Sequence, residues 1–107
     1  MSMYPSKLVK FSSKYVKEGM VYVTFPGEYS DGSIAMQIYS EEGEPLCRPT
    51  TCLVEYGYKP SEGNVFIKTW SENEGVYEGL LKAGIIGEVV RKVPAGYAEA
   101  FECPLIL

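Results

Sequence analysis

The densest group of polar side chains in the sequence is the run Ser71-Glu72-Asn73-Glu74. Two carboxylates this close could act as a general acid and base if one of them stayed protonated near neutral pH. The same residues fit a helix capping box, in which the Ser71 hydroxyl and the Glu74 carboxylate each accept the other residue's backbone N–H. Because a helix N-terminus favours ionised acids, we predict a structural cap at Ser71 and Glu74 and no catalytic residue.

The candidate nucleophiles are three cysteines, Cys47, Cys52 and Cys103. A reactive cysteine needs a neighbouring base or cation to form its thiolate, and the chain contains no histidine. Arg48 follows Cys47, but adjacent residues of a strand point to opposite faces. The five-residue interval from Cys47 to Cys52 does not match a zinc-binding C-x2-C pair. We therefore predict free structural thiols, no metal and no cofactor.

Length and composition indicate one globular domain spanning residues 1–107. The chain is 46% hydrophobic and 22% charged, as in folded soluble proteins. It shows neither the apolar core of a signal peptide nor a run long enough to span a bilayer. An odd number of cysteines fits a reducing compartment. We expect a cytoplasmic protein that does not enter the membrane.

The charge is unevenly distributed along the chain. Residues 1–17 contain four lysines and no acid, namely Lys7, Lys10, Lys14 and Lys17, whereas the rest of the chain holds all 14 acidic residues. This arm could bind nucleic acid through phosphates, or it could be an edge strand whose lysines prevent edge-to-edge pairing. We favour the edge strand, since lysine lacks the bidentate fork that arginine offers to phosphate and guanine. Nucleic acid is therefore not expected as a partner.

Short runs of β-branched and aromatic residues, separated by Gly and Pro turns, predict a series of strands. Pro26-Gly27 is expected to end the second strand, and Asp31-Gly32 to form the next turn. Pro49 excludes a regular central ladder around it, so its strand is expected at an edge or a bulge. The expected strands are residues 8–11, 20–25, 33–39, 46–56, 64–70, 85–93 and 97–103.

A single helix is predicted over residues 72–83, because the apolar period there changes from two to 3.6. Val76 and Leu80 lie on one stripe, and Gly84 suits the position after the C-cap. Gly75 and Gly79 share a face, which indicates a close backbone approach. Glu78 and Lys82 have the spacing of an ion pair. The predicted fold is α+β, a curved antiparallel sheet of about six strands with one helix on one face.

Four short segments, in order, resemble a known family. They are KTWSENEG at residues 68–75, AGII at 83–86, VPAGY at 93–97 and CPL at 103–105. Together they are similar to a family of small proteins of unknown function, found mostly in bacteria, their plasmids, conjugative elements and phages. The resemblance covers residues 66–105 best and is weak before Met20. It implies no catalytic residues and an accessory role in a bacterium or mobile element.

The remaining candidates for function are surface residues that could bind a protein. Aromatic residues are frequent at binding hot spots, and three of them flank one loop or end a strand. The predicted contact residues are Tyr56, Tyr58 and Trp70, joined by the acidic Glu41, Glu42 and Glu44. The predicted function is a non-catalytic accessory protein that binds an unidentified protein partner. One form of it is an inhibitor of a host nucleic-acid-handling protein, which requires a contiguous acidic face that stands in for phosphate.

Two alternatives remain open at the sequence level. The first is a small-ligand-binding module with a pocket between helix and sheet, near Trp70 and Tyr77. The second is an enzyme, which would need a pocket with two carboxylates, one of them with a strongly raised pKa. The pattern does not determine the oligomeric state.

Overall fold

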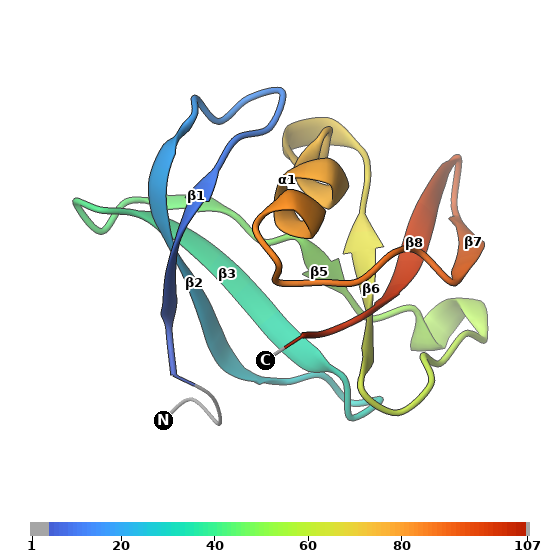
Figure 1. The fold of residues 1–107 in the computed structure, drawn as a ribbon. Helices are drawn as coiled ribbons and strands as arrows, with labels where there is room; N and C mark the ends of the chain where they lie inside the picture. Colours follow the sequence, from blue (N-terminus) through green and yellow to red (C-terminus); the bar gives the residue numbers. More distant parts are fainter. Residues whose placement is uncertain (1–4, 107) are drawn as a thin grey trace.

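Residues 5–106 are described by the computed structural model, and they form two four-stranded antiparallel sheets and one α-helix (Figure 1). The α+β class is confirmed, but the prediction of one sheet of about six strands is wrong. The first sheet has the order β1-β2-β3-β4, with β1 Lys7–Phe11, β2 Gly19–Glu28, β3 Ile34–Ser40 and β4 Pro45–Cys47. The second has the order β5-β6-β8-β7, with β5 Thr50–Thr51, β6 Asn64–Lys68, β7 Arg91–Ala95 and β8 Ala98–Pro104.

The chain passes from one sheet to the other at Arg48-Pro49, between β4 and β5. Proline has no N–H to continue a ladder, so the long strand expected over residues 46–56 is divided into two short edge strands. Thr50 still ties the sheets together at this corner. Its hydroxyl accepts a hydrogen bond from the Met36 N–H at 2.9 Å, and its carbonyl accepts one from the Tyr29 hydroxyl at 3.0 Å.

β2 continues past the point where the sequence predicts its end. Its register against β3 shifts between Thr24 and Gly27, as at a β-bulge. Phe25 is buried in the core while Pro26 is exposed. The bulge therefore accommodates the proline without interrupting the strand, and the predicted stop is wrong. The predicted turn at Asp31-Gly32 is confirmed, with the Tyr29 N–H bonded to the Ser33 carbonyl.

The helix is shorter than predicted at its N-terminus. A 3-10 turn, η2 Ser71–Asn73, precedes α1 Val76–Lys82. The residue before α1 is Gly75, whose φ of 81° lies in the left-handed region. The C-terminus ends as predicted. Gly84 has a φ of 77° and donates its N–H to the Leu81 carbonyl, as expected of a Schellman motif.

The main core lies between the two sheets and α1. The inward residues of β2 and β3 meet Val65 and Ile67 of β6 and Val76 and Leu80 of α1, and all are buried. A second, smaller core lies on the other face of the second sheet, under the 3-10 turn η1 Val54–Tyr56. It consists of Leu53, Phe66, Val93 and Ala100.

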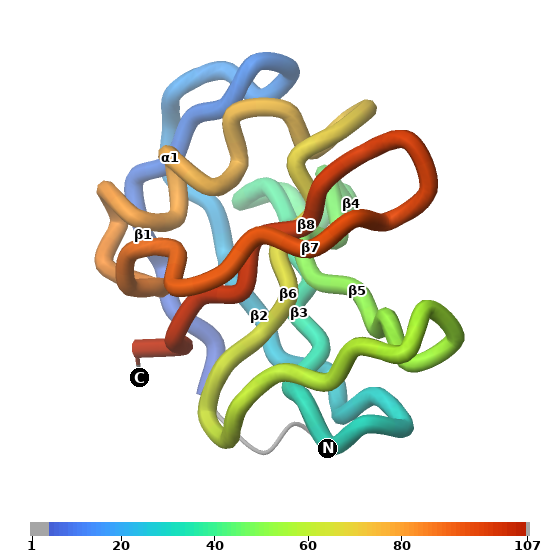
Figure 2. The backbone as a smooth tube through the Cα atoms, turned by 90° about the vertical axis from the view of Figure 1, so that its right-hand side faces the viewer, coloured from blue at the N-terminus to red at the C-terminus, as the bar shows by residue number. Residues whose placement is uncertain are grey.

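α1 lies against the segment that leaves β1, and both views show the two elements side by side (Figures 1 and 2). A Cβ at Gly79 would clash with the Ser12 carbonyl oxygen and lie 2.6 Å from the Phe11 ring. A Cβ at Gly75 would lie 3.0 Å from the backbone nitrogen of Lys14. The predicted close approach is therefore confirmed, and its partner is the end of β1.

Candidate functional site

β1 is an edge strand, since β2 is its only partner among residues 5–106. The Ser40 N–H donates to the Glu44 carbonyl and not to β2. Val21, which is paired with Ser40 in the register, therefore directs its N–H and C=O groups toward Val9 of β1. Backbone groups of successive residues alternate in direction along an antiparallel ladder. Leu8 and Lys10 therefore direct their N–H and C=O groups toward the open edge.

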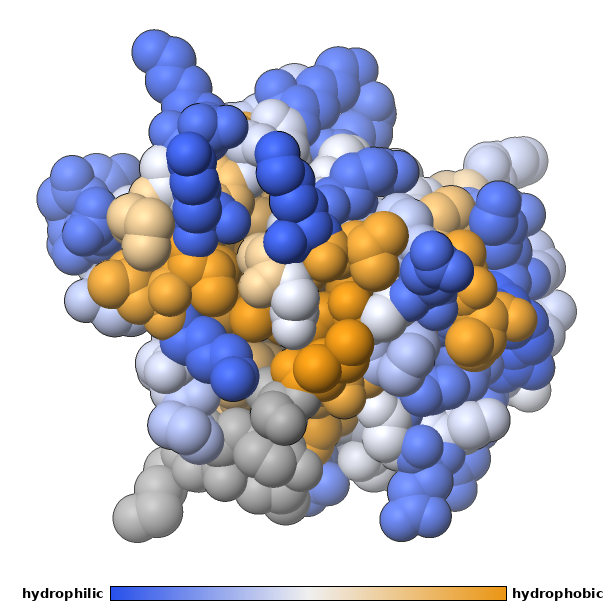
Figure 3. Space-filling model, viewed as in Figure 1, coloured by the Kyte–Doolittle hydropathy of each residue, from blue (hydrophilic) through white to orange (hydrophobic). Residues whose placement is uncertain are grey.

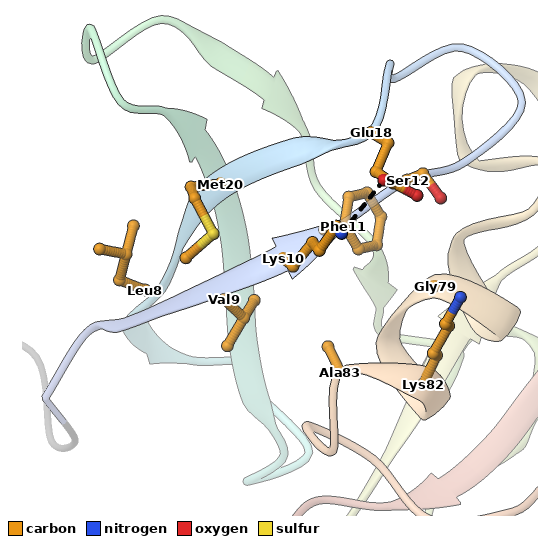
Figure 4. Close-up of a pocket in the computed structure, with 10 residues that line it drawn as sticks. All are labelled: Leu8, Val9, Lys10, Phe11, Ser12, Glu18, Met20, Gly79, Lys82 and Ala83. Atoms are coloured by element: carbon orange, nitrogen blue, oxygen red, sulfur yellow. Dashed lines mark ion pairs between the residues drawn. The ribbon is translucent and has the colours of Figure 1, made fainter.

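A groove of about 420 Å³ runs between this edge and α1 (Figure 4). Leu8 and Met20 lie on the outer side of β1, and Val9 lies on the side facing Ala83. The exposed fractions of Leu8 and Met20, 46% and 41%, are large for such apolar residues. Figure 3 shows hydrophobic surface in the region of β1 and β2, flanked by hydrophilic side chains. The groove is lined by Leu8, Val9, Lys10, Phe11, Ser12, Glu18, Met20, Gly79, Lys82 and Ala83.

The rim of the groove carries mostly positive charge. Lys10 forms an exposed ion pair with Glu18, with nitrogen and oxygen 3.2 Å apart. Lys7 and Lys82 form no ion pair with any described residue, and the predicted Glu78–Lys82 pair is absent from this part of the chain. Among the residues that line the groove, Lys82 is thus a cation that no acid of residues 5–106 neutralises, and Lys7, also unpaired, stands next to the groove as the first residue of β1.

The predicted capping box does not form. The Ser71 side chain makes no cap hydrogen bond, and its φ is 53°. The Glu74 carboxylate instead accepts a hydrogen bond from Lys14 at 2.9 Å, which raises the pKa of Lys14. The Lys14 N–H also bonds to the Glu74 carbonyl. This contact with the β1–β2 loop holds Glu74 outside the helix, so the helix begins after Gly75.

Two of the three predicted aromatic residues border the smaller core of the second sheet. Tyr58 and Trp70 pack against the smaller core. Tyr56 is 51% exposed, and its hydroxyl would lie 3.9 Å from a Cβ at Gly96. Two of the three are therefore partly used in packing, and Tyr56 is the most accessible of them.

The predicted acidic residues lie elsewhere. Glu41, Glu42 and Glu44 are exposed in the turn between β3 and β4. In Figure 1 this turn is at the far left, whereas η1, which contains Tyr56, is at the right. The structure therefore does not bring the predicted acidic and aromatic residues together.

Trp70 and Tyr77 do not share the predicted ligand pocket. Tyr77 packs edge-to-face on Phe101, with ring centroids 5.1 Å apart, and lines a hollow of about 210 Å³ without Trp70. Glu74 and Glu78 also line this hollow, but Glu74 is held by Lys14. Its volume is below the range typical of small-molecule sites.

A buried charged group that the sequence reasoning missed is Glu102 of β8, which is 2% exposed. It accepts hydrogen bonds from the Ser61 N–H, the Asn64 amide and Arg91, all at 2.8–2.9 Å. Burial raises the pKa of Glu102, but these hydrogen bonds and the Arg91 charge outweigh it, so the net pKa is lowered. The network fastens the loop before β6 to the second sheet. In the sequence, the one indication of this burial is that Glu102 lies two residues after Ala100 and so shares its face of the predicted strand.

The cysteines are free thiols, as predicted. Burial, followed by the charge of Glu72, raises the pKa of Cys47 to about 11. Burial also raises the pKa of Cys103 to about 12. Both thiols therefore remain protonated at neutral pH, the opposite of what a nucleophile requires.

No protein-family model, curated protein or solved structure matches the chain. The family resemblance of residues 66–105 therefore stays a prediction. Within residues 5–106, no helix has the length and apolar character needed to cross a membrane. In the same residues, no three Cys, Asp or Glu side chains converge as ligands for a metal ion.

Proposed function

We propose that the protein is a non-catalytic protein-binding domain, which takes up an extended segment of its partner as an added strand along β1. The observation that carries this proposal is the open edge of β1 beside an apolar groove. In strand addition, the edge backbone supplies hydrogen bonds, and pockets for alternate side chains supply specificity.

The two sides of the edge suit such a strand. Inward side chains of the segment would meet Val9 and Ala83, and outward ones would meet Leu8. Covering Leu8 would remove exposed apolar surface from water, which favours association. The contact of α1 with the end of β1 holds one wall of the groove in place before any partner binds.

This proposal keeps the predicted protein-binding class and moves the contact surface to β1. The phosphate-mimic form gains no support, because Glu18, Glu74 and Glu102 are paired with cations and the Glu41–Glu44 turn stands apart. The bacterial or mobile-element origin and the cytoplasmic location remain predictions from the sequence.

Selection from a random library of displayed peptides of about nine residues tests strand addition. Leu8→Pro removes the edge N–H without touching the bonds of β1 to β2, and Leu8→Ala shortens the same side chain but keeps the N–H. We expect selected peptides to bind the wild type and Leu8→Ala, and to lose at least about tenfold in affinity on Leu8→Pro, or roughly 1.4 kcal/mol.

Two N-methylated versions of a selected peptide supply the control. One carries methyl groups on odd-numbered amides and the other on even-numbered amides, so each blocks one edge of the peptide. Strand addition predicts that one version fails to bind and the other still binds. Equal binding of both versions would contradict it, as would a library from which no peptide distinguishes Leu8→Pro from Leu8→Ala.

A small-ligand site is the second candidate, because the groove volume of about 420 Å³ lies within the range of small-molecule pockets. The groove is open along β1, however, and its walls offer few convergent polar groups. A fragment screen followed by NMR distinguishes the two candidates. Fragments that bind at Val9 and Ala83 while every library peptide fails would favour the small ligand.

A further inference from the structure

We propose that the segment captured at β1 is acidic, with Glu or Asp flanking an apolar residue that enters the groove. This inference rests on the proposed strand addition and names the chemistry of the partner.

The charge around the edge supports an acidic segment. Lys7 and Lys10 belong to β1 itself, and Lys82 stands on the opposite wall. Glu18 is the one acid that lines the groove among the described residues, and Lys10 already pairs with it. A strand laid along β1 would therefore place its side chains beside Lys7 and Lys82, which form no ion pair among the described residues, and beside the Lys10–Glu18 pair. This surplus of positive charge favours carboxylates and disfavours lysine or arginine.

The inner wall supports an apolar residue at the centre of the segment. Val9 and Ala83 are partly buried and pack against the main core. Gly79 is covered by Phe11 and Ser12, so that part of the wall is closed by β1 itself. The accessible inner surface is thus apolar and short, with the cations on its rim.

The same lysines argue against a second copy of this chain as the occupant. Antiparallel pairing of two β1 strands about Val9 would set each Lys7 opposite Phe11 and each Lys10 opposite Leu8. Two unpaired Lys7 side chains and two Lys10–Glu18 pairs would then lie along one new ladder, which leaves a surplus of positive charge. Lysines on an edge strand are a known means of preventing self-association, and they leave the edge available to a segment of opposite charge.

Three synthetic peptides of about nine residues test the inference. In each, valine alternates with a second residue, which is glutamate, threonine or lysine. Binding is measured by fluorescence anisotropy with the intact protein. We expect the valine–glutamate peptide to bind at least about tenfold more tightly than the valine–threonine peptide, and the valine–lysine peptide not to bind. Added salt should weaken the binding of the valine–glutamate peptide most.

A charge-reversed variant and a matched control locate the effect. Lys7→Glu/Lys10→Glu should invert the preference, so that the valine–lysine peptide becomes the tighter ligand. Lys59→Glu/Lys92→Glu changes the net charge equally at positions outside the groove and should leave the order unchanged. Circular dichroism confirms that both variants fold.

The possible failures are distinguishable. Equal binding of the glutamate and threonine peptides, or an unchanged order in Lys7→Glu/Lys10→Glu, would overturn the acidic preference and leave strand addition standing. An equal loss of affinity for the valine–glutamate peptide in both double variants would show that the preference depends on net charge alone, and would overturn the inference. Formation of a β1-dependent dimer in sedimentation would replace the acidic segment with a second copy.

Discussion

At the scale of single residues, the clearest feature is a buried carboxylate with a complete set of partners. Removing one member of such a network leaves another charged or polar group buried without compensation. Glu102 avoids this cost because Arg91, Asn64 and the Ser61 N–H all bond to it. Glu102 does not line the groove along β1, and its bonds to the loop before β6 give it a structural role.

The lowered pKa of Glu102 predicts an acid-sensitive component of stability. A carboxyl with a depressed folded-state pKa stabilises the protein fully above its unfolded value of about 4.5, and the contribution is lost as the pH falls through the folded pKa. Urea midpoints should therefore fall below pH 4.5 in the wild type and fall less steeply in Glu102→Gln. The exposed neighbour substitution Glu99→Gln should keep the wild-type slope; identical slopes in all three proteins would refute this role.

Thiol reactivity follows from the burial of the cysteines. Cys47 and Cys103 are buried with raised pKa values, whereas Cys52 is partly exposed beside Ser30. In a native-state Ellman assay at pH 8, Cys52 should react first, and Cys47 and Cys103 only after unfolding. Cys52→Ser should remove the fast phase. A fast phase that persists in Cys52→Ser would show that a buried thiol is reactive.

The backbone conformation of Ser71 leads to a stability prediction opposite to the one that a capping box would give. A non-glycine residue at a φ of 53° carries a cost of about 1 kcal/mol, and the Ser71 hydroxyl caps nothing. Ser71→Gly should stabilise the protein by up to about 1 kcal/mol, while Ser71→Ala should change stability by less than about 0.5 kcal/mol. A loss of about 1 kcal/mol in Ser71→Ala, measured by urea unfolding, would restore the capping box.

At the scale of elements, the docking of α1 on the end of β1 sets the geometry of the groove. Gly79→Ala raises helix propensity by up to about 1 kcal/mol, but its Cβ would collide with Phe11 and Ser12. We expect a net loss of at least about 1 kcal/mol. Gly27→Ala, which has no atom within 4 Å of the new Cβ, is the matched control. Stabilisation by Gly79→Ala in thermal unfolding would mean that the helix stands away from β1.

Elements whose cause is local were predictable from the sequence. The turn at Asp31-Gly32, the helix end at Gly84 and the existence of a hairpin before the C-terminal strand follow from residues close in the chain. The first strand of that hairpin was placed wrongly over residues 85–93, since β7 is Arg91–Ala95. The start of the helix was not predictable, because Lys14 holds Glu74 from 60 residues away. The division into two sheets was also out of reach, since Pro49 predicts a break but not the pairing that follows it.

The candidate site was predictable only in part. The lysines of residues 1–17 indicated an edge strand, and the structure places Lys7 and Lys10 on one. The groove itself depends on α1 lying beside β1; the spacing of Gly75 and Gly79 predicts a close approach to the helix but not which segment makes it. The predicted aromatic and acidic residues were chosen by type, and type alone does not place Glu41 and Tyr56 on a common face.

At the scale of the whole molecule, the uneven charge along the sequence corresponds to a particular region of the fold. Lys7 and Lys10 of the lysine-rich segment lie on the open edge strand β1, while the acidic residues are dispersed over the rest of the chain or paired with cations. The molecule thus presents one extended site with positive charge and exposed apolar residues. That combination is the basis of our proposal that an acidic extended segment binds there, and lysines on an edge strand disfavour self-association.

Amide hydrogen exchange, measured by NMR with and without the valine–glutamate peptide, tests strand addition most directly. The Leu8 and Lys10 amides face the open edge, and Val9 already bonds to β2, so the peptide should slow exchange at Leu8 and Lys10 by about tenfold or more and leave Val9 nearly unchanged. Unchanged exchange at Leu8 and Lys10 in the peptide-bound protein, or protection confined to Tyr56 and Tyr58, would contradict the account.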